Sequence, residues 1–135
     1  MPRSYIVDSS ALVAYLDQRE QHHEWAEGLF GPMPTPWLTC DAALAESFYL
    51  LKGTSAQLLK RLLRSESLRL AFDFHSEMVP VLDLMDKYAD VPMSLADACL
   101  VRMTEILPDP VVLTTDHDFR LYRRHSRQVI PCRMP

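Results

Sequence analysis

Glycine is scarce in this chain of 135 residues. Only three are present, at positions 28, 31 and 53, and they form no glycine-rich loop that could hold a phosphate group. The sequence also lacks the HExxH pair of zinc peptidases and the Gly-x-Ser-x-Gly turn of serine hydrolases. P-loop enzymes, dinucleotide-dependent enzymes, zinc peptidases and serine hydrolases are therefore disfavoured.

Cysteines and long apolar segments are also few. The three cysteines, Cys40, Cys99 and Cys132, are odd in number and contain no CxxC pair, which disfavours both a disulfide framework and a zinc site. No apolar run approaches the roughly 18 residues that a membrane span needs, and no signal-peptide core precedes the first acid. We therefore expect a soluble, cytoplasmic protein with reduced thiols and no membrane partner.

Charge is unevenly distributed along the chain, whose net charge is −4. Residues 1–116 contain 9 Lys and Arg against 17 Asp and Glu, whereas residues 117–135 contain 5 Arg against one Asp. Four of these arginines form a cluster, which we call the arginine cluster: Arg120, Arg123, Arg124 and Arg127. The cluster is compatible with RNA phosphate binding, but a solvated helix face explains it equally well.

Length and patterning predict one α/β domain over residues 1–135. Strands are predicted at 4–7, 37–40, 67–72, 111–114 and 128–131, and helices at 10–17, 22–30, 42–52, 55–64, 76–88, 94–107 and 119–124. Because helices separate the strands, we expect a parallel sheet with both faces covered. The helix at 42–52 is apolar almost all round, so we expect it to be buried.

Four acidic residues stand where an acid is locally out of place. Asp8 and Asp116 each follow an apolar run, while Glu46 and Asp97 lie in helical patterns with mostly apolar neighbours three and four positions away. Ligands of open parallel sheets collect outside the carboxyl ends of the strands, where all four acids are able to converge. A buried lone carboxylate costs several kcal/mol, so a shared divalent metal ion is the economical counter-charge.

Each acid also has a purely structural explanation. Asp97 follows Ser94 at the spacing of a helix-capping box, and Asp116 could cap a short helix. Asp8 could belong to a turn, and Glu46 could pair with a buried arginine. Four such coincidences in one domain are less probable than one shared cause.

Hydroxyl side chains stand beside the acidic strand ends, at Ser9, Ser10, Thr114 and Thr115. Such groups hold carboxylates or metal-bound waters, although they are more often helix caps, so we expect them at most to support the acids. A site built from carboxylate oxygens selects Mg²⁺ or Mn²⁺ over zinc. The chemistry that fits such a site is metal-assisted hydrolysis of phosphodiester bonds.

Four segments of the chain resemble, in order and spacing, the acidic motifs of PIN-domain ribonucleases, and the resemblance spans essentially the whole chain. The segments are Ile6–Ala14 (IVDSSALVA), Glu46 within Ala45-Glu46-Ser47, Ser94–Ala98 (SLADA) and Leu113–Phe119 (LTTDHDF). The resemblance implies a three-layer α/β/α fold with about five parallel strands. By the same likeness, Asp8, Glu46, Asp97 and Asp116 are metal ligands, Asp118 is an auxiliary acid, and Ser9 or Ser10 takes the family's hydroxyl position.

The chain is also similar to the toxins of VapBC-type toxin–antitoxin pairs. This likeness implies a Mg²⁺- or Mn²⁺-dependent endoribonuclease that forms homodimers and binds an antitoxin. Two alternatives stay open: a catalytically silent binding module with the same fold, and a receiver-like signalling domain. The receiver-like domain is the weaker alternative, because it would need a lysine after a late strand and the segment after Thr115 has none.

Overall fold

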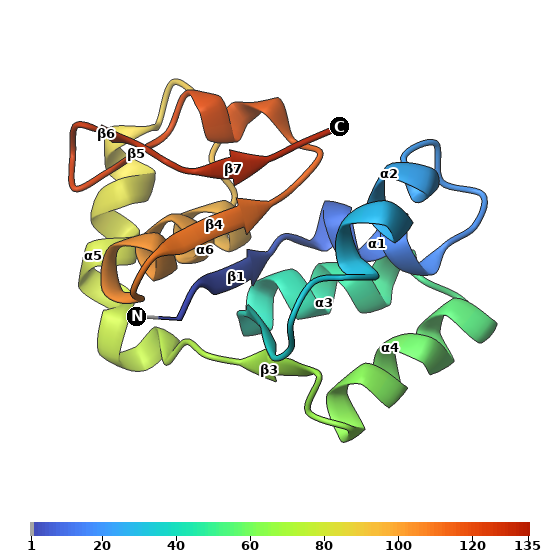
Figure 1. The fold of residues 1–135 in the computed structure, drawn as a ribbon. Helices are drawn as coiled ribbons and strands as arrows, with labels where there is room; N and C mark the ends of the chain where they lie inside the picture. The colour runs from blue at the N-terminus through green and yellow to red at the C-terminus, as the bar shows by residue number, and fades with distance from the viewer. Residues whose placement is uncertain (1) are drawn as a thin grey trace.

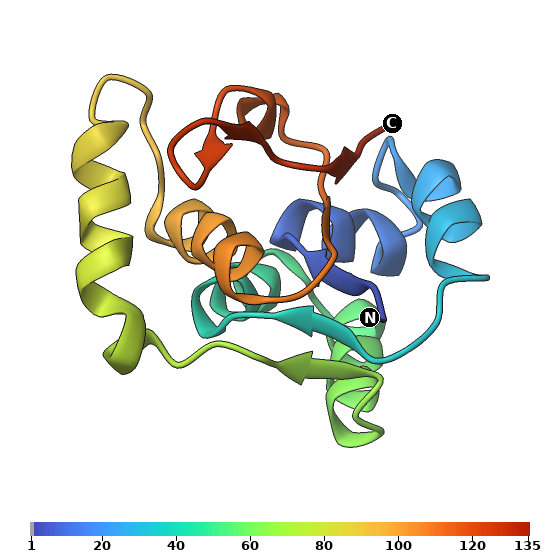
Figure 2. The same ribbon diagram turned by 60° about the vertical axis from the view of Figure 1, so that its left-hand side comes forward.

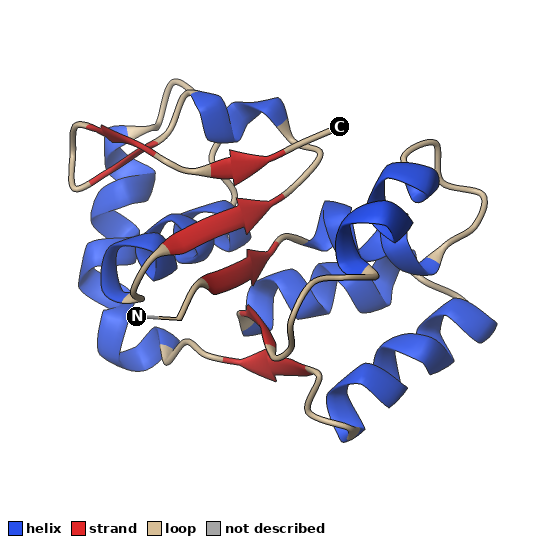
Figure 3. Cartoon of the chain, in the orientation of Figure 1, coloured by secondary structure: helices blue, strands red, loops and turns tan. Residues whose placement is uncertain are grey.

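The computed structural model describes residues 2–135, which form a central sheet with helices on both faces (Figures 1 and 3). In chain order the elements are β1 (Ser4–Val7), α1 (Ser9–Leu16), α2 (His23–Phe30), β2 (Trp37–Thr39), α3 (Asp41–Leu50), α4 (Thr54–Arg64), β3 (Leu68–Leu70), α5 (Phe74–Lys87), α6 (Leu95–Ile106), β4 (Pro110–Leu113), the 3₁₀ helix η1 (His117–Arg120), β5 (Arg123–Arg124), β6 (Gln128–Val129) and β7 (Cys132–Arg133).

The main sheet has five strands in the order β3-β2-β1-β4-β7, and all its pairings are parallel. Consecutive residues of a strand face opposite sides of the sheet, so Ile6 and Val112 join the core under α5 and α6. Val7 and Leu113 join the core under α1, α2 and α4. The fold class expected from the sequence, a three-layer α/β/α fold with about five parallel strands, is confirmed.

The last strand of the sheet was wrongly placed by sequence reasoning. The sequence predicts it around residues 128–131, but Gln128 and Val129 pair antiparallel with Arg123 and Arg124 in a separate two-stranded hairpin. The fifth strand of the main sheet is β7, which pairs with β4. The expected helix at 119–124 is likewise replaced by η1 and the first strand of this hairpin.

Helix α3 is less buried than its apolar sequence predicts. Among the residues of α3 only Ala43 and Ser47 are buried, and Tyr49 is 79% exposed. The prediction of a buried helix was wrong because alanine, which makes up much of α3, is compatible with either side of a helix. The exposed side of α3 carries Tyr49 and Leu50 together with the acids Asp41 and Glu46.

Residues 2–135 contain no helix that is both long and apolar enough to cross a membrane. Cys40, Cys99 and Cys132 are free thiols, and the first two are buried.

Candidate metal centre

Two of the four acids are placed directly by the carboxyl ends of the strands. Asp8 follows β1 and occupies the N-cap position of α1, where its backbone N–H donates to Leu113 O at 3.0 Å. Asp116 lies beyond β4 and caps η1, and Asp97 lies in the first turn of α6. The parallel pairing of Val7 with Leu113 sets Asp8 beside Thr114, so β1 and β4 bring their following residues together.

Asp8 is held by two hydroxyl groups. Thr114 Oγ1 donates to Asp8 Oδ2 at 2.7 Å, and Ser10 Oγ donates to the same oxygen at 3.0 Å. Asp8 is only 4% exposed and Thr114 is fully buried. These contacts fix the orientation of the carboxylate without neutralising its charge.

Glu46 reaches Asp8 through Ser9. Ser9 Oγ donates to Glu46 Oε2 at 2.8 Å and lies 3.4 Å from Asp8 Oδ1, so its single proton favours the glutamate. Glu46 itself is exposed, in the second turn of α3. The expectation that this side chain points into the core is therefore wrong, but the side chain does point to the first acid of the site.

Asp97 caps helix α6 and also lies beside other acids of the site. Its backbone N–H donates to Ser94 Oγ at 3.0 Å, and its Oδ2 accepts from the Ser94 backbone N–H at 3.4 Å, which completes a capping box. The same Oδ2 accepts a hydrogen bond from the buried Tyr122 hydroxyl at 3.1 Å. The capping explanation is correct, and Asp97 nevertheless lies close enough to Asp8 and Asp116 to interact with their charges.

Asp116 and Asp118 form a tight turn beyond β4. The Asp116 backbone N–H donates to Thr114 Oγ1 at 2.9 Å, and the Asp118 N–H donates to Asp116 Oδ1 at 2.9 Å. Thr114 therefore connects Asp8 with the backbone of Asp116. Hydrogen bonds thus join the acids at the β1 and β4 ends into one connected cluster.

Burial and like charge act together on the cluster. Burial raises the pKa of Asp8 to about 6; the hydrogen bond from Thr114 opposes this shift, and the charge of Asp97 adds to it. Burial also raises the pKa of Asp97, against the hydrogen bond from Tyr122 and with the charge of Asp116. Burial, and then the charge of Asp97, raise the pKa of the Tyr122 hydroxyl, so this group acts as a donor.

These carboxylates have no cationic side chain to neutralise them in the part of the chain that the structure describes. The ion pairs among residues 2–135 include none of Asp8, Glu46, Asp97, Asp116 and Asp118. The alternative that Glu46 pairs with a buried arginine is therefore wrong. A cluster of oxygen donors that lacks a counter-charge has the chemistry that Mg²⁺ and Mn²⁺ require.

The oxygen donors of the site have the chemistry that a hard divalent cation requires, but their positions do not yet form a coordination shell. Within residues 2–135, no three His, Cys, Asp or Glu side chains are already gathered closely enough to surround one ion. The Ser9 hydroxyl instead lies between the carboxylates of Asp8 and Glu46, and the hydroxyls of Ser10 and Thr114 bond to Asp8. Binding an ion here would therefore require side chains such as the exposed Glu46 to rearrange.

Sequence reasoning missed one residue that supports the acids, and only one of the two threonines that it named contacts Asp8 through a hydroxyl group. Tyr122 carried no signal, because a tyrosine six residues after Asp116 is ordinary in sequence and meets Asp97 only in the fold. Thr114, rather than Thr115, supplies the hydroxyl that contacts Asp8; Thr115 contributes its backbone N–H, which donates to Ser10 Oγ at 3.0 Å. The feature of the sequence that pointed to Thr114 was its position directly after a fully apolar strand.

The arginine cluster divides into two pairs. Arg123 donates to the carbonyl groups of Arg120 and Tyr122, and Arg124 donates to Thr104 O, so both guanidinium groups hold backbone. Arg120 and Arg127 are exposed, and neither takes part in an ion pair within residues 2–135. The exposed pair is therefore the part of the cluster that is available to phosphate.

The fold and the acidic edge define a nuclease-type α/β domain, and comparison with protein families agrees. A family model described as PIN domain matches residues 5–124. The chain therefore belongs to the PIN-domain family, whose members are generally nucleases that typically use divalent metals. No curated protein matches the sequence. The family assignment sets aside a receiver-like domain.

Proposed function

We propose that this protein is a Mg²⁺- or Mn²⁺-dependent endoribonuclease. The observation that carries the proposal is the cluster of Asp8, Glu46, Asp97 and Asp116 at one edge of the sheet, without any cationic partner among residues 2–135. Buried carboxylates without a counter-charge destabilise a fold. A bound cation would offset this cost and would explain why the acids lie together. Membership of a nuclease family supports the same function.

Each residue has a definable part in this proposal. Asp8, Glu46, Asp97 and Asp116 would hold the ion, with Asp118 as an auxiliary acid, and the ion would supply Lewis acidity and an activated water for phosphodiester hydrolysis. Ser9 orients Glu46, and Thr114 orients Asp8 and fixes the backbone of Asp116. Tyr122 restrains Asp97 by donating to one of its oxygens.

Asp97→Asn tests the proposal most directly. The carboxamide oxygen still accepts from Ser94 N–H, so the cap is largely retained, whereas the negative charge that a hard cation needs is removed. We expect Mn²⁺-dependent cleavage of a broad panel of single-stranded and hairpin RNAs to fall by at least about a hundredfold, with little change in melting temperature. The matched control is Asp90→Asn, an exposed acid outside the cluster.

A specific result would favour a different function. If the purified, partner-free wild type cleaves no RNA of the panel with Mg²⁺ or Mn²⁺ but still binds it, the protein is a catalytically silent binding module. Full activity of Asp97→Asn together with a lowered melting temperature would reduce Asp97 to a helix cap and remove it from the proposed ligands.

We further propose that the protein is the toxin of a toxin–antitoxin pair, acts in the cytoplasm and forms homodimers. The likeness of its single-domain length to VapBC-type toxins supports this role. Expression of the chain alone should arrest bacterial growth, Asp97→Asn should not, and co-expression of a small upstream reading frame should restore growth. Normal growth at high levels of the active enzyme would contradict the toxin role, and a monomeric mass in solution would contradict the dimer.

A further inference from the structure

An apolar pocket of about 350 Å³ opens beside the acidic edge, between the start of α3, the β3–α5 loop and the start of α6. Two half-buried aromatic rings, Phe72 and Phe74, line it together with the partly exposed Leu95. The other lining residues are Cys40, Asp41, Ala42, Ala45 and Cys99. Figure 2 shows the elements that bound this space, with α6 beside α3 and the β3–α5 connection below them.

The pocket adjoins the proposed catalytic residues through shared elements. Ala45 directly precedes Glu46 on α3, and Leu95 lies two residues before Asp97 on α6. Cys40 provides a further link: a hydrogen bond with Cys99 lowers the pKa of its thiol, and the nearby charge of Asp8 opposes that shift. The pocket and the acidic cluster therefore share the N-terminal turns of α3 and α6.

Asp41 gives the pocket its polarity. Asp41 is the one charged residue in the lining, it is exposed, and it takes part in no ion pair within residues 2–135. An apolar side chain from a protein partner would cover this carboxylate without satisfying it, which is unfavourable. The fitting ligand combines a flat apolar body with hydrogen-bond donors at one edge.

We propose that this pocket binds one unpaired guanine base of the RNA substrate, with the ring against Phe72 and Phe74 and its N1–H and N2–H groups donating to Asp41. Proteins recognise single-stranded RNA by stacking bases on aromatic side chains and by hydrogen-bonding their Watson–Crick edges. Guanine presents two adjacent donors on that edge, which match the two oxygens of a carboxylate. The inference rests on the proposed nuclease function and names a base preference for it.

Mononucleotide binding tests the pocket separately from catalysis. In chelator, saturation-transfer NMR with 5′-GMP, AMP, CMP and UMP should show the strongest transfer to the guanine base, and GMP should shift the ring signals of Phe72 and Phe74. Asp41→Asn should weaken GMP binding about tenfold, because the carboxamide no longer accepts from both donors. The exposed Asp83→Asn should leave binding unchanged.

A second variant guards against indirect effects of Asp41→Asn. Ala45→Leu, at an exposed position of the rim, should fill the pocket and abolish the base signals while the melting temperature stays near that of the wild type. Equal binding of all four nucleotides, no shift of the two phenylalanines, or unchanged affinity in both variants would overturn the proposal. RNA cleavage without a guanine preference would contradict the proposed guanine site but not the proposed nuclease activity. GMP binding without any RNA cleavage would contradict the nuclease activity but not the guanine site.

Discussion

At the scale of single residues, Asp8 shows that burying a carboxylate of the site costs the fold stability. The residue is almost fully buried, accepts two hydroxyl hydrogen bonds and forms no ion pair within residues 2–135. Hydroxyl donors stabilise a carboxylate less than a counter-ion does, so burial dominates and the pKa of Asp8 rises to about 6. The fold therefore tolerates this residue better in its protonated form when no metal is present.

This shift predicts the pH dependence of stability. Because the pKa of Asp8 is higher in the folded than in the unfolded chain, its contribution is fully present below about pH 4 and is lost as pH rises through about 6. In chelator, the unfolding free energy of the wild type relative to Asp8→Asn should fall by roughly 3 kcal/mol over this window. Urea unfolding of both proteins from pH 4 to pH 7 measures the difference. A difference that is flat with pH would refute the assignment.

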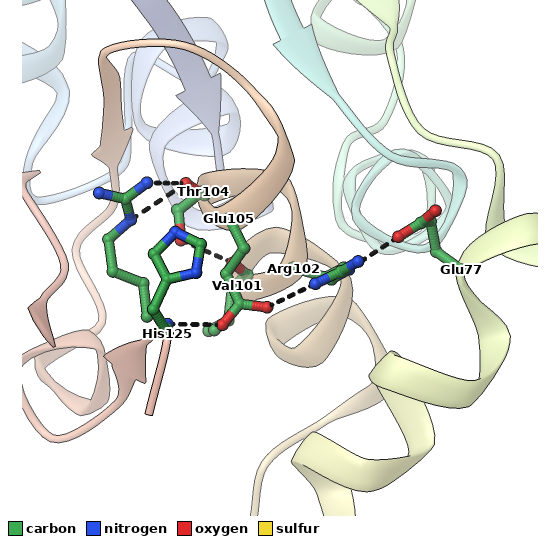
Figure 4. A network of polar contacts seen from close by, with 7 residues as sticks. Glu77, Val101, Arg102, Thr104, Glu105 and His125 are labelled. Carbon is green, nitrogen blue, oxygen red and sulfur yellow. Dashed lines mark hydrogen bonds and ion pairs between the residues drawn. The ribbon is translucent and has the colours of Figure 1, made fainter. Parts of the chain in front are cut away.

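At the scale of elements, the β5–β6 hairpin is anchored to the helices by a charged network, drawn in Figure 4. Arg102 of α6 donates to Glu77 of α5 at 2.7 Å and to Glu105 at 3.1 Å, and Glu105 in turn accepts from the His125 backbone N–H at 2.7 Å. His125 and Ser126 have φ of 49° and 69°, a region unfavourable for residues other than glycine. The network therefore holds a strained turn in place.

Removing the cation of this network should destabilise the protein. Arg102→Met retains the aliphatic stem but leaves the two partly buried glutamates unpaired, so we expect a loss of about 1–3 kcal/mol in unfolding free energy. The exposed Arg19→Met, whose ion pair lies on the surface, should cost less than about 1 kcal/mol. Urea unfolding at neutral pH gives both values, and equal losses would show that the network contributes nothing beyond a surface pair.

Hydrogen bonds to the backbone divide the arginine cluster into a bound pair and an exposed pair. Arg120 and Arg127 are exposed, whereas Arg123 and Arg124 hold backbone carbonyl groups. Arg120→Ala/Arg127→Ala should weaken binding to every RNA sequence and reduce the slope of log K against log salt by about 0.7 for each phosphate that the variant no longer neutralises. Filter binding across a salt series measures this, with Arg3→Ala/Arg19→Ala as the control. An unchanged slope would leave the cluster a solvated surface.

At the scale of the whole molecule, the acidic edge couples metal binding to folding. Asp8, Glu46, Asp97 and Asp116 come from the end of β1, α3, α6 and the end of β4, so only the folded chain brings them together. A ligand that binds only the folded state stabilises it by mass action. Metal binding should therefore appear as an increase in global stability.

Addition of Mn²⁺ should raise the melting temperature of the wild type. At about 100 times the dissociation constant, the gain in unfolding free energy is about 2.7 kcal/mol. Asp8→Asn should lose most of this gain, and Asp90→Asn, which changes an exposed acid outside the cluster, should keep it. Thermal melts in chelator and at saturating Mn²⁺ provide the comparison. Identical curves for the wild type with and without Mn²⁺ would argue against a metal site.

The sequence by itself determined the fold class and singled out the acids as candidate ligands. Short apolar runs separated by helical patterns are local features, and they were sufficient to indicate a parallel sheet covered on both faces. Acids that interrupt such patterns, as Asp8 and Asp97 do, are also visible locally, because each contradicts the polarity of its neighbours.

Only the tertiary structure decided how the acids are held and which residues surround them. Hydrogen bonds such as those of Ser9 with Glu46 and Tyr122 with Asp97 join positions 37 and 25 residues apart, and no local pattern encodes them. The same limit explains why the sequence misplaced β7 and predicted a buried α3. A two-residue strand carries too little pattern to be recognised, and alanine-rich helical turns do not reveal which side faces solvent. Side-chain contacts between distant segments depend on register and packing, which arise only when the whole chain folds.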